Sequence, residues 1–230
     1  MSALPPEILL CDNHLLGVVK PAGVPMVPDA SGDPSLLEQA RAWVKRRYGK
    51  PGNVFLGVVH RLDRPVSGVA VFARTSKAAA RLSDLWRRHE LKRIYRGVTA
   101  GEPPGEEGRL EQWLLKDRPR NIIRAVEEQH PGARRAVTFW RVLERRAGRS
   151  LLELEPLTGR SHQLRAACAA LGMPLLGDLK YGAGTPLPDR SIALHARSLA
   201  FRHPVRPETV RLEAEVPARF PLGSRPSGGG

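Results

Sequence analysis

Short apolar segments, separated by glycine, proline and polar turn residues, recur along the chain, and this pattern limits the fold more than any other feature of the sequence. Segments of this length and spacing are typical of strands joined by turns. The strands predicted in this way are 15–19, 54–59, 69–73, 94–99, 122–126, 136–143 and 151–156. Because most of them follow one another directly, the sequence predicts an α+β fold with a mostly antiparallel or mixed sheet and flanking helices.

Three further segments have helical periodicity. Residues 35–48 place their apolar side chains on one face, and Ser35 and Glu38 have the spacing of a capping box. Ser76 is expected to cap a second helix that ends near Glu90. A third helix is expected over residues 161–171, closed by Gly172.

The chain of 230 residues contains no internal repeat and no long linker. We expect one domain over residues 1–221 and a disordered tail rich in glycine, serine and proline over residues 222–230. The N-terminus lacks the order of a secretion signal, and no apolar run has membrane-spanning length. The two cysteines lie far apart and match neither disulfide nor zinc spacing, so we expect a cytoplasmic protein. We also expect a monomer.

The charge balance indicates a polyanionic partner. Lysine and arginine total 37 against 23 acidic residues, giving a formal net charge of +14, and most of the basic residues are arginine. The planar guanidinium group suits phosphates and stacks on bases, which favours a nucleic acid as the partner. The alternative is a composition bias that produces a solvated basic surface. Charge alone does not separate an RNA-modifying enzyme from a passive RNA-binding protein.

A carboxylate in a polar segment between two predicted strands is the first candidate for chemistry. Asp63 has Arg61 and Arg64 on either side, and nearby cations favour the ionised carboxylate that a nucleophile requires. Loops on a rigid scaffold are also where catalytic groups tend to lie. The alternative is an ordinary turn aspartate held by local hydrogen bonds.

The second candidate is the segment 158–165, where a strand ends at Gly159 and a helix is expected to begin at Ser161. The N-terminus of a helix offers free backbone N–H groups to an anion, and Arg160 and Arg165 flank it. The alternative is a capped helix with solvated arginines. We interpret His162 as a hydrogen-bonded structural residue, since the histidines lack the spacing of a zinc site.

Several motifs in a fixed order resemble the RluA-like family of RNA pseudouridine synthases. The central one is His60-Arg61-Leu62-Asp63 followed by Ser67-Gly68. The others are Lys20 to Gly23, Lys92 to Tyr95, Gly132 to Thr138, Thr158 to Arg165, Gly172 to Asp178 with Tyr181-Gly182, and Leu194 to Ala196 with His203-Pro204. Together they cover about residues 15 to 205, and their order makes the resemblance specific.

The resemblance implies the pseudouridine synthase fold, a central RNA-binding cleft, and isomerisation of uridine in rRNA or tRNA with no cofactor and no metal. Asp63 would be the essential carboxylate, acting as a nucleophile or as a base. Arg165 would keep the pKa of Asp63 low, and Tyr95 would stack on the target base. The uridine would be flipped out of its stack, with Arg61 filling the vacated space. The remaining substrate-contacting residues would be His60, Arg64, Arg160, His162, Gln163 and Leu176.

The chain departs from the family pattern in three places. Pro65-Val66 stands where acidic and threonine residues are common, and Ala166-Ala167 stands where many members carry valine and histidine. No small basic RNA-binding domain of the S4 type precedes Lys20, so we expect the catalytic domain to select its RNA alone.

Two other classes of function are compatible with parts of the sequence. A non-catalytic RNA-binding or ribosome-assembly protein would explain the charge, but it has no need for the set of Asp63, Tyr95 and Arg165. A nucleoside or glycoside hydrolase would normally use two carboxylates, and only Asp63 has a suitable setting. The resemblance implies that Asp63 pairs with Arg165, with Arg160 as the rival partner, and we expect Asp178 to be structural.

Overall fold

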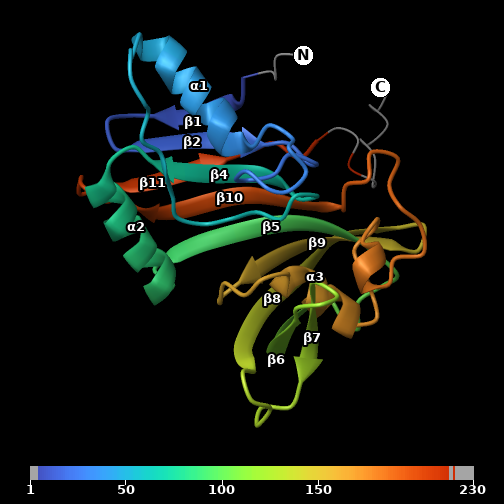
Figure 1. Cartoon of the computed structure of the whole chain (residues 1–230). Helices are drawn as coiled ribbons and strands as arrows, with labels where there is room; N and C mark the ends of the chain where they lie inside the picture. The colour runs from blue at the N-terminus through green and yellow to red at the C-terminus, as the bar shows by residue number, and fades with distance from the viewer. Residues whose placement is uncertain (1–4, 218–219, 221–230) are drawn as a thin grey trace, which may run out of the picture. The chain divides into compact units, whose positions relative to one another are not determined.

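The computed structural model of the chain describes residues 5–217 and 220 (Figure 1). The chain divides into two compact units, which we call unit 1 (Met1–Lys92 and Ala196–Ala214) and unit 2 (Arg93–His195 and Glu215–Gly230). The tail expected at residues 222–230 lies outside the described residues. Two such units can belong to one folding domain, so the single domain expected over residues 1–221 stays a prediction.

Unit 1 is built on a sheet whose strands come from both ends of the chain. Its strands are β1 (Glu7–Cys11), β2 (Leu15–Lys20), β3 (Gly57–Val58), β4 (Ser67–Ala73), β10 (Leu194–Arg202) and β11 (Thr209–Glu213). The order is β1-β2-β4-β10, with β3 paired to β4 and β11 paired to β10. The pairs β1–β2, β2–β4, β3–β4 and β10–β11 are antiparallel.

Two helices, α1 (Leu36–Tyr48) and α2 (Ser76–Arg88), pack on opposite faces of this sheet (Figure 1). The alternation of side chains along β2 and β4 explains the arrangement. Leu16 and Phe72 belong to the apolar cluster that contains the buried residues of α1. Leu15 and Val71 point to the other face and join the cluster that contains Leu82 of α2.

The helix ends follow local capping rules. Ser35 and Glu38 form the predicted capping box, with Ser35 N–H donating to Glu38 Oε2 (2.9 Å) and Glu38 N–H donating to Ser35 Oγ (3.3 Å). The cap predicted for α2 was placed one residue late, because Thr75 accepts the hydrogen bond from Ala78 N–H (3.1 Å) and Ser76 is already helical. A threonine and a serine in succession both suit this position, so the sequence alone does not choose between them.

Unit 2 contains a second run of antiparallel strands. They are β5 (Leu91–Ala100), β6 (Glu107–Asp117), β7 (Ile122–Val126), β8 (Arg134–Arg146) and β9 (Arg149–Pro156), in the order β5-β9-β8-β6-β7. The helix α3 (Gln163–Ala170) contributes Ala166 to a cluster with Leu114 and Ile123, and a short 3₁₀ helix, η1 (Leu179–Tyr181), follows it. The predicted α+β class is confirmed.

Several predicted boundaries were wrong. The strand predicted over 54–59 contains only β3, the two residues Gly57–Val58. The helix expected from Ser161 begins at Gln163, because His162 adopts a left-handed conformation with φ 49°. The strands β1, β6, β10 and β11 were not predicted. Among the described residues, no helix combines the length and the apolar character needed to cross a membrane.

Candidate active site

Asp63 lies in unit 1, on the loop that connects β3 to β4. Its carbonyl accepts a hydrogen bond from Val66 N–H (3.0 Å), which closes a turn. Leu62 and Val66, on either side, are 6% and 3% exposed and anchor the loop in the apolar interior. The Asp63 side chain stays partly exposed, and Arg61 is exposed. The loop therefore presents a carboxylate at the surface from a fixed backbone.

Arg64 is held by contacts that the sequence did not predict. Its Nε donates to the carbonyl of Gly23 (2.9 Å), and its guanidinium forms ion pairs with Asp33 and Asp29. In return, the Gly23 N–H donates to the carbonyl of Arg64 (2.8 Å). Arg64 thus ties the Asp63 loop to the turn after β2, and its predicted contact with RNA stays a prediction.

Lys20 is a fully buried cation close to Asp63, and the sequence analysis gave it no role. Its Nζ donates to the carbonyls of Pro21 (2.9 Å), Val24 (2.8 Å) and Arg64 (3.0 Å). Burial lowers the pKa of Lys20 to about 7, because a charge is costly away from water; the charge of Asp63 opposes this shift and that of Arg64 adds to it. Two signals were available in the sequence, namely a lysine at the end of an apolar strand and its place in the motif Lys20 to Gly23.

Replacing this cation tests its role. We expect Lys20→Met to reduce turnover about 100-fold, as the loss of a preorganised electrostatic group does. It also removes one donor from each of three carbonyls, of which that of Arg64 keeps the Gly23 N–H, and this loss lowers the free energy of unfolding. The measurements are turnover at saturating RNA and thermal unfolding, with Lys50→Met, at an exposed lysine, as the control. Normal turnover in the folded variant would show that Lys20 contributes to stability and not to turnover.

The pH dependence of stability gives a second readout for Lys20. Its pKa in the folded chain, about 7, is below the value of 10.5 for the free side chain. Between these two values the unfolded chain binds more protons, so this group makes the free energy of unfolding rise with pH from about 7 to about 10.5. The Lys20→Met variant lacks this contribution, and the difference is measured by denaturant titration at both ends of the range.

The backbone at the end of the Asp63 loop requires a glycine, Gly68. Its φ is +118°, and a Cβ at this position would lie 2.3 Å from the carbonyl oxygen of Ala196 and 2.5 Å from its nitrogen. A larger residue is thus excluded by backbone conformation and by the close approach of β10. Gly68 is also the cross-strand neighbour of Lys20, which places the buried cation at the end of the loop.

His60 is oriented towards the α2 face of the sheet by two contacts. Its Nε2 accepts a hydrogen bond from Val71 N–H (3.0 Å), and its ring stacks on Trp86 with centroids 4.8 Å apart and an interplanar angle of 18°. These contacts fix the start of the Asp63 loop on β4 and α2. The substrate contact expected for His60 stays a prediction.

Arg165 lies in unit 2, on α3, and is 5% exposed. Its Nε donates to Oδ2 of Asp178 and its Nη2 donates to Oδ1, both at 2.7 Å. Asp178 is 1% exposed, so this two-pronged pair is withdrawn from water. The guanidinium carbon also lies 4.9 Å from the ring centroid of Tyr181. Asp178 is therefore structural, as expected, but it acts directly on a predicted catalytic residue.

Tyr181 joins Arg165 to two further elements. Its hydroxyl accepts a hydrogen bond from Ile123 N–H of β7 (2.7 Å) and shares another with His162 Nδ1 (2.9 Å). The interpretation of His162 as a hydrogen-bonded residue is confirmed. Cys168 lies on α3, three residues after Arg165. Burial raises the pKa of Cys168 to about 12, and the charge of Asp178 adds to the rise, so this thiol stays protonated.

The segment before α3 is fixed by Gln163, which is 4% exposed. Its Oε1 accepts from Thr158 Oγ1 (2.7 Å) and from Arg160 N–H (3.1 Å). Its Nε2 donates to the carbonyl of Val137 (2.9 Å) and to Thr138 Oγ1 (3.0 Å). Both ends of the amide are engaged within the protein, which gives Gln163 a structural role; contact with substrate stays a prediction.

The other predicted residues of unit 2 lie on the sheet and the loops around it. Arg160 Nε donates to the carbonyl of Arg135 (3.0 Å). Tyr95 lies on β5 opposite Leu154 of β9. The Leu176 N–H donates to the carbonyl of Val98 (2.9 Å), and its side chain packs on that residue.

The structure thus groups His60, Arg61, Asp63 and Arg64 in unit 1, and Tyr95, Arg160, His162, Gln163, Arg165 and Leu176 in unit 2. The pairing of Asp63 with Arg165, or with its rival Arg160, stays a prediction. In residues 5–217 and 220, no group of three or more His, Cys, Asp or Glu side chains is arranged as metal ligands would be.

Comparison with known proteins identifies the family. The family described as RNA pseudouridylate synthase matches residues 14–170. An uncharacterised RNA pseudouridine synthase of Bacillus subtilis (strain 168) is 37% identical over 214 residues, covering 92% of this chain and 69% of that protein. The dual-specificity RNA pseudouridine synthase RluA of Haemophilus influenzae is 35% identical over 214 residues, covering 91% and 92%.

Solved structures agree with the sequence comparisons. The human RNA pseudouridylate synthase domain containing 4 superposes with a TM-score of 0.77 at 25% identity, covering 93% of this chain and 90% of that one. The segments that carry Asp63 and Arg165 both fall within the matched region. The chain therefore belongs to the RNA pseudouridylate synthase family, whose members isomerise uridine in RNA to pseudouridine.

Proposed function

We propose that this enzyme acts on one or more specific uridines of rRNA or tRNA, in the cytoplasm and as a monomer, with Asp63 as its essential carboxylate. The observation that carries the assignment of Asp63 is its place on a loop anchored by Leu62 and Val66, where its charge acts on the buried Lys20. One relative, the ribosomal large subunit pseudouridine synthase D of Zymomonas mobilis, supports rRNA as the substrate class, and the dual-specificity enzyme of Haemophilus influenzae supports more than one RNA target.

In the proposed reaction the glycosidic bond between the ribose and a ring nitrogen of the flipped uridine breaks, and the base turns. A ring carbon then bonds to the ribose and loses its proton, and the released ring nitrogen gains one. Asp63 acts in its ionised form, as the nucleophile or as a base at the ribose. Tyr95 stacks on the base, and Arg165 supplies the positive charge that faces Asp63. The Asp178 pair supports the role of Arg165, since it holds the guanidinium in one orientation.

The target is found by mapping pseudouridines in total RNA from cells with and without the gene. We expect one or a few rRNA or tRNA positions to lose pseudouridine, and the purified chain to restore them without added metal or cofactor. An unchanged map, together with no activity of the purified chain on that RNA, would refute the proposal.

The net charge of +14 leads to a prediction about binding. Contacts with phosphates release counterions, so RNA affinity should fall by about 0.7 log units per log unit of salt for each contact to a single strand. Fluorescence anisotropy with labelled RNA at several salt concentrations measures the slope. A flat dependence would mean that the basic surface has no part in RNA recognition.

A further inference from the structure

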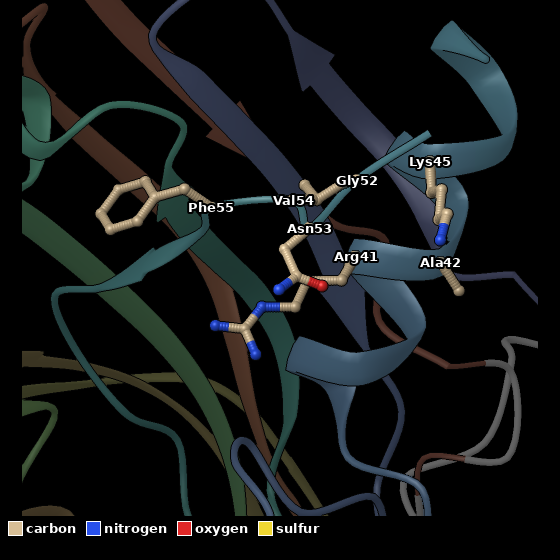
Figure 2. A pocket seen from close by; sticks show the side chains of 7 residues that line it. All are labelled: Arg41, Ala42, Lys45, Gly52, Asn53, Val54 and Phe55. Atoms are coloured by element: carbon tan, nitrogen blue, oxygen red, sulfur yellow. The ribbon is translucent and has the colours of Figure 1, made fainter. Parts of the chain in front are cut away.

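An open groove lies on unit 1 between α1 and the segment that precedes β3 (Figure 2). Its volume is about 540 Å³. The residues that line it are Arg41, Ala42, Lys45, Gly52, Asn53, Val54 and Phe55. None of them has a part in the site described above, so the groove is a second surface of the same unit.

One wall of the groove carries two cations, of which Arg41 interacts electrostatically with Glu38 one turn earlier on the chain. Arg41 and Lys45 lie one turn apart on the exposed side of α1, and within residues 5–217 and 220 neither forms an ion pair. The sequence between Glu38 and Asp63 contains no acidic residue. It contains six basic ones, Arg41, Lys45, Arg46, Arg47, Lys50 and Arg61. A concave surface with such a charge attracts a polyanion.

The opposite wall adds an aromatic ring. Phe55 lies in the segment between α1 and β3, and it is 52% exposed. Its Cζ lies only 3.4 Å from the position that a Cβ of Gly57 would occupy, so the ring rests over a glycine. In Figure 2 the ring lies at one end of the groove and Lys45 near the other, with the guanidinium of Arg41 between them. Phe55 is therefore exposed enough to contact a planar partner.

We propose that this groove binds a single-stranded segment of the RNA substrate, with Phe55 stacking on a base and Arg41 and Lys45 contacting phosphates. A positively charged groove with an aromatic platform is the general solution for single-stranded nucleic acid. An acidic peptide would use the two cations but not the ring. The inference rests on the proposed function and deepens it, because it places nucleotides outside the target uridine.

Chain geometry limits how far these nucleotides lie from the target. Phe55 and Asp63 are eight residues apart in the sequence, which an extended chain spans in at most about 29 Å. Both residues belong to unit 1. Nucleotides held in the groove would thus lie within about 29 Å of the target uridine, and they would contribute to the choice of RNA.

The test measures binding apart from turnover, in the full chain carrying Asp63→Asn. The probe is a labelled single-stranded RNA that contains uridine. Its length is about 12 nucleotides, within the usual range of site sizes. We expect Phe55→Leu to weaken binding about 10-fold and Phe55→Trp to preserve it, since stacking requires the ring. Lys45→Ala should reduce the salt slope by about 0.7, the value for one phosphate contact.

Lys77→Ala is the matched control, because Lys77 is an exposed lysine on α2, the helix on the opposite face of the sheet. It should leave the slope unchanged. Wild-type affinity of Phe55→Leu, or equal slopes for Lys45→Ala and Lys77→Ala, would overturn the inference. If polyglutamate displaces the probe as effectively as unlabelled RNA does, the inference is also overturned, and an acidic protein becomes the favoured partner.

The two proposals fail in different ways. If the wild-type chain forms pseudouridine in RNA while the groove variants bind normally, the groove proposal alone fails. If the wild-type chain forms none but Phe55→Leu and Lys45→Ala weaken RNA binding as expected, the proposed function fails and the groove stands as an RNA-binding surface.

Discussion

The Asp63→Asn variant is expected to form no detectable pseudouridine, a loss of at least about 10⁴-fold relative to the wild-type chain. Asparagine keeps the shape of the side chain but removes the charge and the nucleophilic oxygen. Leu62 and Val66 still anchor the loop, so folding and RNA binding should be largely intact. The measurement is pseudouridine formed in single turnover, together with thermal unfolding and RNA affinity.

Asp84→Asn is the control for this variant. Asp84 lies on α2, where its carboxylate pairs with Arg87 and Arg88 at the surface, and such pairs contribute little. Its turnover should equal that of the wild type. Substantial turnover by Asp63→Asn would refute the mechanism, whichever step the carboxylate is assigned to.

The Asp178→Asn variant is expected to lose both stability and turnover. Breaking a buried ion pair leaves the guanidinium of Arg165 without its counter-charge, which typically costs about 3–5 kcal/mol. From the sequence alone, Asp178 was expected to be structural, so its replacement was expected mainly to lower stability. The two hydrogen bonds from Arg165 to Asp178 predict in addition that the remaining folded enzyme turns over more slowly, about 10-fold or more, as with other supports of a functional group.

The turnover measurement must therefore count folded enzyme only, at a temperature well below the melting point of the variant. A positioning role predicts a fall in kcat with a smaller change in KM, and partial recovery in Asp178→Glu, which restores the charge. A folded Asp178→Asn variant with normal kcat would confine the pair to stability.

Features that depend on neighbouring residues were predicted well from the sequence. The capping box of Ser35 and Glu38 forms as expected, because its partners are three residues apart. The strand β7 has the predicted bounds, Ile122–Val126. The short strands β1 and β11 were missed because pairing and burial in a sheet decide them, and their own sequences carry little periodicity.

The site shows the same limit more sharply. The resemblance pointed to Asp63 and Arg165 through their motifs, but not to the side chains that hold them. Lys20 reaches the carbonyl of Arg64 from a strand 44 residues earlier in the chain. The pairing of Arg165 with Asp178 joins a helix to the start of η1. Such contacts arise from packing between distant segments, which no local pattern records.

The split composition of unit 1 has a consequence for the order in which the chain can fold during synthesis. Unit 1 needs residues 196–214, whereas most of unit 2 is the continuous stretch 93–195. Until β10 and β11 leave the ribosome, the face of β2 and β4 that includes Leu15 and Val71 lacks Phe201 and Leu212, with which it shares one core. Unit 1 is therefore begun first but completed only after the stretch 93–195 has been translated, and its nascent apolar face must be kept from aggregating for about 100 residues of elongation, or roughly 5–20 s.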